Sequence, residues 1–194
     1  MAVTLFDGSS GVVVALRPEA TPAIAVEAGP RGAELAAVLR RVLAFHGLSA
    51  AVTVAPVPPA AGLWLRPGPF TGAPSAADLR AGGVAPEDWS LYLARAPYRA
   101  PLTFSRDALL AARGERAELL AVARSLAGAP AEASSRGVVG YRKRFADRLA
   151  DDLDLAGALD AVWDGLKPGA LSPGSRAGLL RLADPVLGLG LFSL

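Results

Sequence analysis

The amino-acid sequence predicts an α+β fold, in which a small βαβ unit with an N-terminal hairpin packs on a C-terminal all-α helical bundle. Residues 1–72 contain short β-type runs, turns and a single amphipathic helix. Over residues 73–194, apolar side chains recur at three- and four-residue spacing, which is typical of helices. A proline-rich connector at residues 55–62 precedes this change, and proline excludes long regular elements there. We therefore expect a reduced α/β region and a helical bundle, divided near residue 72.

Five short strands and one helix are expected in the N-terminal region. Residues 3–6 and 12–16 flank an Asp-Gly-Ser-Ser turn and predict a hairpin. The helix over residues 32–46 has a continuous apolar stripe and stops at Gly47. Further strands are expected at residues 23–28, 51–57 and 63–66. The order of strand, helix and strand predicts a βαβ unit with a right-handed crossover.

The C-terminal region is almost wholly helical by pattern. Ser75, Ser105 and Asp154 are placed to cap helices, and Gly114 is expected to break or bend the longest one. Single helices are expected at residues 76–81, 86–94, 106–126 and 172–187, and an antiparallel helical hairpin at residues 138–166. A hairpin of this kind is usually part of a core. Its acidic break, Asp151, Asp152 and Asp154, is interpreted as a helix junction and cap, not as catalytic carboxylates.

Composition excludes several kinds of site. The net charge is only +2, and the absence of cysteine excludes disulfides, thiol nucleophiles and thiolate metal sites. His46 is the single histidine; it is interpreted as structural or exposed, because a catalytic imidazole needs partners that the sequence does not offer. The N-terminus does not resemble a signal peptide, and the apolar runs are too short to span a bilayer. We expect a cytoplasmic protein without membrane contact.

Three stretches, in order, resemble cysteinyl-tRNA synthetases. Residues 74–113 are similar to a run of that family that contains Tyr-Arg-x-Pro and a capping serine, here PYRAPLTFS at residues 97–105. The segment FADRLADDLDLAGAL resembles the aspartate-rich helical hairpin of the family's DALR-type bundle, and LLRLADPVLGLGL at residues 179–191 resembles its closing helix. The N-terminal LFDGSSGVVVALRPE, VEAGP and VLRRVLAFHGLSAAVTVAPV are fainter matches. The resemblance implies a remnant of a Rossmann-like domain joined to a helical bundle.

The family's catalytic signatures are missing at the matching positions. The histidine signature at the start of the first helix is replaced by Gly29-Pro30-Arg31-Gly32, and the KMSKS stretch by the lysine-free residues 65–69. Ala28 stands where the first zinc-binding cysteine would be. The resemblance therefore implies no catalytic residue, no metal and no cofactor in this chain, which indicates a pseudoenzyme.

Two groups of residues are candidates for binding. Arg31 and Gly32 begin a helix, where backbone amides favour an anion; a plain tight turn is the alternative. Arg142, Lys143, Arg144 and Arg148 form a basic flank suited to an RNA backbone, and ordinary helix-surface ion pairs are the alternative.

Three functions follow as hypotheses. The first is a catalytically inactive cysteinyl-tRNA synthetase-like protein that acts as a binding or interaction module, with tRNA as its partner. The second is an enzyme, or enzyme subunit, of the cysteine ligase type with altered chemistry. The third is a dimerising or protein-interaction module whose exposed sheet edge is covered by a protein partner or a second copy.

Overall fold

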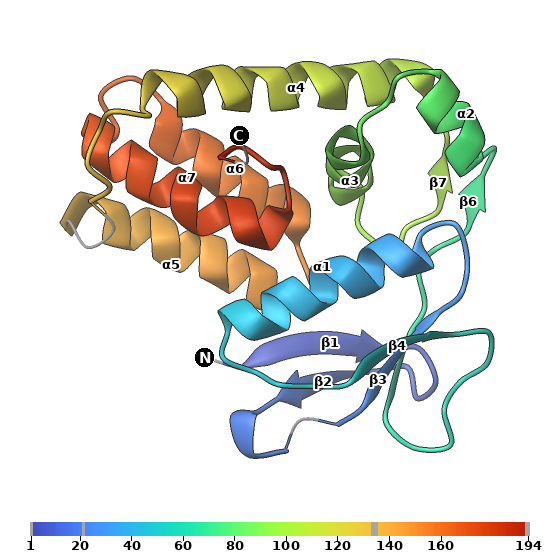
Figure 1. The fold of residues 1–194 in the computed structure, drawn as a ribbon. Coiled ribbons are helices and arrows are strands. Elements are labelled where there is room, and N and C mark those ends of the chain that lie inside the picture. Colours follow the sequence, from blue (N-terminus) through green and yellow to red (C-terminus); the bar gives the residue numbers. More distant parts are fainter. Residues whose placement is uncertain (1, 21, 133–135, 193–194) are drawn as a thin grey trace.

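The computed structural model describes residues 2–20, 22–132 and 136–192 and has the α+β architecture expected from the sequence (Figure 1). Strands β1–β5 gather at one end of the molecule, whereas the short strands β6 and β7 lie beside α2 (Figure 1). The strands are β1 Val3–Asp7, β2 Val12–Leu16, β3 Ile24–Glu27, β4 Val52–Ala55, β5 Leu63–Leu65, β6 Phe70–Thr71 and β7 Leu102–Thr103. The helices are α1 Gly32–Phe45, α2 Ala76–Ala81, α3 Pro86–Ala94, α4 Arg106–Ser125, α5 Arg136–Ala150, α6 Leu155–Leu166 and α7 Pro173–Leu187, with a 3-10 turn at Pro18–Ala20. Among the described helices, none is both long and apolar enough to cross a membrane.

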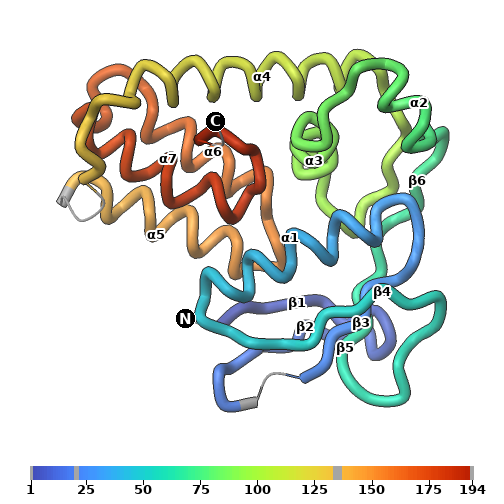
Figure 2. Tube along the Cα trace, viewed as in Figure 1, coloured from blue at the N-terminus to red at the C-terminus, as the bar shows by residue number. Residues whose placement is uncertain are grey.

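The central sheet contains three parallel strands in the order β4-β3-β5 (Figure 2). Ile24 of β3 lies opposite Val52 of β4 and Leu63 of β5. Helix α1 connects β3 to the parallel strand β4, so the expected βαβ unit is present. The strand residues of β3 and β5 are largely apolar and buried, as parallel strands require.

The N-terminal hairpin joins this sheet through Asp7. β1 and β2 are antiparallel, with Leu5 opposite Val14. The Trp64 N–H donates to Oδ1 of Asp7 at 3.0 Å, and the Gly8 N–H donates to the Trp64 carbonyl at 2.7 Å. A buried carboxylate thus connects the hairpin turn to the middle of β5.

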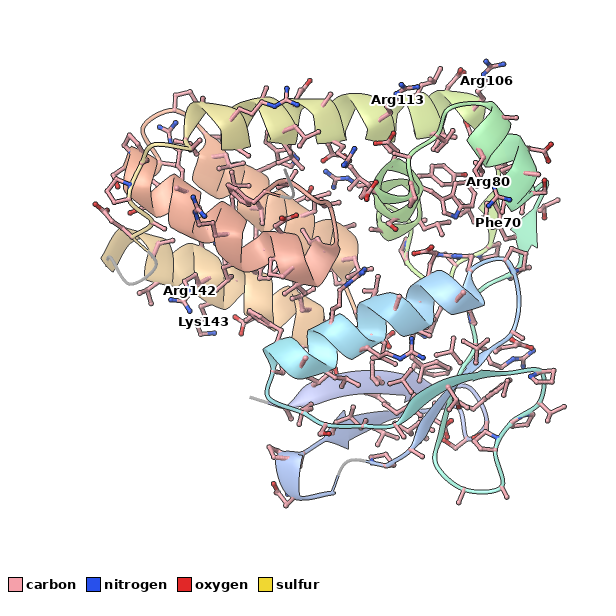
Figure 3. The ribbon with its side chains drawn as sticks, viewed as in Figure 1. Phe70, Arg80, Arg106, Arg113, Arg142 and Lys143 are labelled. Carbon is pink, nitrogen blue, oxygen red and sulfur yellow. The ribbon has the colours of Figure 1, made fainter. Side chains whose placement is uncertain are left out.

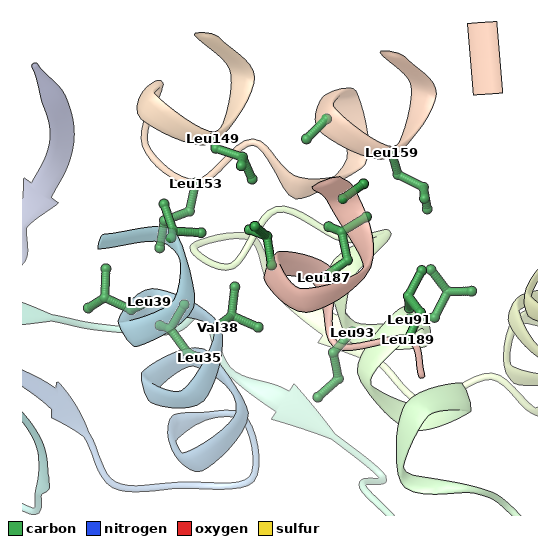
Figure 4. Close-up of a cluster of buried hydrophobic side chains, with 14 of the residues drawn as sticks. Leu35, Val38, Leu39, Leu91, Leu93, Leu149, Leu153, Leu159, Leu187 and Leu189 are labelled. Carbon is green, nitrogen blue, oxygen red and sulfur yellow. The ribbon is translucent and has the colours of Figure 1, made fainter. Parts of the chain in front are cut away.

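The larger of two hydrophobic clusters among the described residues extends from the sheet into the helices. Leu35, Val38 and Leu39 of α1 face Leu149, Leu153 and Leu187 of the C-terminal helices (Figure 4). Across the same interface, Nε of Arg41 donates to the Val186 carbonyl at 3.0 Å. Helix α1 therefore contacts the sheet with one face and the helical bundle with another.

The helix caps agree with the sequence. The side-chain oxygens of Ser75, Ser105 and Asp154 accept hydrogen bonds from the backbone N–H groups of Asp78, Ala108 and Gly157, at 3.1, 3.2 and 2.9 Å. These bonds satisfy amides that have no partner within a helix. The three caps fix where α2, α4 and α6 begin.

Two features differ from expectation. Helix α4 is not broken at Gly114, because a glycine costs only about 1 kcal/mol in a helix and the flanking turns are rich in good helix formers. The short strands β6 and β7 were not expected from the sequence. The Leu102 N–H donates to the Pro69 carbonyl at 2.8 Å and the Phe104 N–H to the Thr71 carbonyl at 2.9 Å, so the pairing joins two loops that are distant in sequence.

Candidate functional site

A small pocket lies at the carboxyl ends of β3 and β5, where ligands bind in open α/β sheets. Its walls are the β3–α1 turn, residues 27–32, and the segment 67–70. The volume is about 160 Å³, whereas small-molecule sites usually occupy about 300–1,000 Å³. The side chain of Glu27 adds negative charge at this edge and lies 3.3 Å from Nε of Arg66.

Arg31, one of the predicted anion-binding residues, lines this pocket but is 4% exposed. Its guanidinium donates to the carbonyl oxygens of Ala100, Pro97 and Ala96 at 2.9, 3.1 and 3.3 Å. Burial lowers the pKa of this guanidinium. Arg31 therefore fastens the start of α1 to the loop after α3.

Gly32, the second predicted residue, forms the tight turn that was the alternative interpretation. Its N–H donates to the Gly29 carbonyl at 3.0 Å. A Cβ at this position would overlap the carbonyl oxygen of Glu27. The turn is present, and anion binding by Arg31 and Gly32 stays a prediction.

His46 lies at the opposite end of α1, about 20 Å from the pocket at 1.5 Å per helical residue. The ring is half-buried and packs edge-on against Phe45, with 5.1 Å between the ring centroids. Burial lowers the pKa of His46, and within the described residues its Nε2 atom has no hydrogen-bond partner. In the part of the chain that the structure describes, no group of three or more His, Cys, Asp or Glu side chains is arranged to hold a metal ion.

The basic flank of α5 is largely paired with carboxylates. Lys143 lies 2.7 Å from Asp147, Arg144 3.6 Å from Asp164, and Arg148 3.1 Å from Asp154. Arg142 and Lys143 lie on the outer side of the helix (Figure 3). Lys143, Arg144 and Arg148 thus each have an acidic partner, which an RNA phosphate would have to displace.

A second group of cations surrounds α2. We use the term α2 face for Arg80, Arg106 and Arg113 together with the two grooves beside α2. All three arginines are exposed, and they lie at the end of the molecule that contains α2 and Phe70 (Figure 3). Each groove has a volume of about 400 Å³, and Pro74, Leu79 and Val84 line both of them. Sequence reasoning missed this group, because its members are far apart in the chain.

A larger cleft, of about 530 Å³, lies between residues 94–100 and the α5–α6 junction. Asp152 is its central residue. Oδ1 of Asp152 accepts from the Tyr98 hydroxyl at 2.7 Å and from the Phe6 N–H at 2.9 Å, while Oδ2 lies 2.7 Å from Nη2 of Arg99. Burial, followed by the bond to Asp152, raises the pKa of Tyr98. The polar groups of the cleft are therefore bonded to one another, and they connect the N-terminal hairpin, the loop after α3 and the α5–α6 junction.

The chain matches no protein-family model, and no curated protein is significantly similar to it. The likeness to cysteinyl-tRNA synthetases therefore depends on the sequence motifs alone. The function must follow from the geometry of the pocket, the cleft and the two basic surfaces.

Proposed function

We propose that this chain is a binding module without aminoacylation chemistry, on a scaffold similar to that of cysteinyl-tRNA synthetases, and that its ligand is RNA. The observation that carries the non-catalytic part is the size and lining of the pocket at the end of the parallel sheet. A nucleoside triphosphate exceeds a volume of about 160 Å³.

The charges at that pocket also disfavour ATP. The guanidinium of Arg31 is already bonded to three carbonyl oxygens, so a phosphate would have to break these bonds. The one cation in the stretch that corresponds to the lysine-rich signature, Arg66, lies 3.3 Å from the carboxylate of Glu27, so a triphosphate would have to compete with this ion pair.

The RNA part of the proposal is supported by exposed arginines. Arg80, Arg106 and Arg113 place exposed cations on the outer surface of α2 and α4. Guanidinium groups on a rigid surface gain affinity for phosphodiesters through the release of counterions. Because the net charge is only +2, such binding would be confined to a patch and not spread over the whole surface.

Two measurements test this proposal. Cysteine-dependent exchange of pyrophosphate into ATP should stay at the level of a protein-free blank over a range of protein concentrations. Activity that rises with protein concentration would instead favour an enzyme with altered chemistry.

The second measurement is a gel-shift titration with bulk tRNA between 50 and 200 mM salt. The logarithm of the binding constant should fall linearly with the logarithm of the salt concentration. Absence of a shift at the lowest salt concentration would rule out the RNA part.

A dimerising module is the second candidate, and the β2 edge favours it. Val12 and Val13 are 54% and 60% exposed, and within the described residues β2 pairs only with β1. An apolar strand with a free edge invites pairing with another chain. Light scattering of the wild type and of Val13→Lys distinguishes the two cases, since an edge-paired dimer should dissociate when a charge is placed on β2.

A further inference from the structure

We infer that the α2 face binds a single-stranded segment of RNA, with Arg106 and Arg113 on its phosphates and the groove between α2 and α4 against its bases. This inference rests on the proposed function and assigns it to a surface that the sequence did not indicate.

The cations of the α2 face make few contacts within the protein. Within the described residues, Arg80 and Arg106 have no ion pair or hydrogen bond through their side chains. The nearest carboxylate oxygen to Arg113 is at 4.0 Å, on Asp88. Asp88 is itself 4% exposed and lies closer to Nη1 of Arg116, at 3.3 Å, than to Arg113.

Two of the arginines are held at a fixed spacing by the same helix. Arg106 and Arg113 are seven residues apart on α4, which places them on one face at a separation of about 10 Å. Two cations at this separation can contact different phosphates of one RNA strand. Ser105 caps the helix immediately before Arg106, so the backbone that carries this cation is fixed.

An apolar surface lies between Arg106 and Arg113. Leu110 falls on the same side of α4 as both, and its side chain is 53% exposed. It lines the groove with Leu109 and Phe104. Unpaired bases bury apolar and aromatic area against such a surface, whereas the bases of a duplex are already stacked on one another. The combination of cations and an exposed apolar wall therefore favours a single strand.

The carboxylates near the α2 face have other partners or roles in the protein, so they do not neutralise its arginines. The carboxylate of Asp78 accepts from the N–H and the hydroxyl of Ser75 in the capping box of α2. Asp107, beside Arg106, lies in the first turn of α4, where the helix dipole stabilises its charge. Glu87 and Asp88 share Arg116, at 3.7 and 3.3 Å. Glu34, which lines the second groove, accepts from the Ser90 hydroxyl at 3.1 Å, so these carboxylates also have partners within the protein.

The test is fluorescence anisotropy with three probes: a 12-nucleotide oligouridylate, a 12-base-pair RNA duplex and polyglutamate of equal charge. Wild-type protein should bind the oligouridylate most tightly. Arg106→Ala/Arg113→Ala should weaken that binding at least tenfold and reduce the salt slope by about 2. Leu110→Ser should weaken it severalfold without changing the salt slope.

Arg124→Ala is the matched control, because Arg124 is an exposed arginine on the same helix but outside the grooves. It should change binding less than twofold, as should Arg142→Ala/Lys143→Ala/Arg144→Ala on α5. Thermal unfolding of each variant establishes that the fold is kept.

Each contrary outcome has a separate meaning. If the wild type binds no RNA, the proposed function fails together with the inference. If RNA binding survives in Arg106→Ala/Arg113→Ala but is lost in the α5 variant, only the inference fails. Duplex binding as tight as oligouridylate binding overturns the single-strand assignment, and equally tight polyglutamate binding overturns RNA in favour of an acidic peptide.

Discussion

The hydroxyl of Tyr98 donates a 2.7 Å hydrogen bond to Oδ1 of Asp152, which follows it by 54 residues in the chain. The same oxygen accepts from the Phe6 N–H at 2.9 Å. The side chain of Asp152 therefore joins the N-terminal hairpin, the loop after α3 and the α5–α6 junction. Asp152 and Leu153 reach this arrangement with φ angles of 48° and 58°, in the left-handed region that non-glycine residues seldom adopt.

Tyr98→Phe should lower the free energy of unfolding by about 1.5–3 kcal/mol, since it removes a hydrogen bond to a carboxylate that is largely buried. Urea denaturation measures the change. Tyr141→Phe is the control, because within the described residues the Tyr141 hydroxyl donates no hydrogen bond, and its loss should be below about 0.5 kcal/mol. Equal losses in the two variants would contradict a special role for the Tyr98 hydroxyl.

Asp152→Asn should cost about 1 kcal/mol and Asp152→Ala about 3 kcal/mol. Asparagine keeps an acceptor for Tyr98 and Phe6 and tolerates a positive φ; alanine does neither. The pair with Arg99 is lost in both variants and contributes little, because Arg99 is 47% exposed. Guanidinium denaturation of both variants measures the two losses, and equal losses would show that the charge of Asp152, rather than its hydrogen-bond geometry, makes it important.

The free energy of unfolding should depend on pH through the carboxyl group of Asp7 in the hairpin turn. Burial alone would raise the pKa of Asp7, but hydrogen bonds from Ser10, from the Trp64 N–H and from Ser9 outweigh burial and lower the pKa well below its usual range. A carboxyl whose folded-state pKa is depressed stabilises the protein above the unfolded-state pKa of about 4, and this stability is lost as pH falls toward the folded-state value.

Asp7→Asn should therefore be less stable than the wild type by about 1–3 kcal/mol at pH 7. The difference should shrink as pH is lowered from about 5 to 2, which denaturation at a series of pH values measures. A difference that stays constant over this range would contradict the depressed pKa.

Gly32→Ala should destabilise the protein by more than about 2 kcal/mol, because the added Cβ overlaps the carbonyl oxygen of Glu27 and the backbone must shift. Gly29→Ala lies three residues earlier in the same turn, and its Cβ would have no neighbour within 4 Å. Its effect should stay within about 0.5 kcal/mol. Thermal unfolding of the two variants checks this contrast.

The sequence predicted the local elements well. The stripe from Leu35 to Leu43 located α1, and the oxygens of Ser75, Ser105 and Asp154 located the starts of three helices. These features depend on side chains within one or two turns of each other, so the sequence contains all the information they need. Strands β6 and β7 were missed because each is stabilised only by a partner about thirty residues away.

Binding residues were harder to predict, because a charge that is clustered in sequence is not thereby available for a ligand. Arg31 was chosen for its place at a helix start, yet its guanidinium is bonded to carbonyls that lie 65–69 residues later. Lys143, Arg144 and Arg148 were chosen as a basic run, yet each lies close to an aspartate. The arginines of the α2 face come from two helices and form no run in the sequence.

The sequence by itself determined the fold class, the βαβ order and the capped helical hairpin, because periodicity and capping act over a few residues. Only the tertiary structure decided that Arg31 is buried, that Asp152 joins three segments and that Arg80, Arg106 and Arg113 lie around α2. The physical reason is that hydrogen bonding and ion pairing depend on distances of about 3 Å between atoms, and packing brings those atoms together from distant parts of the chain.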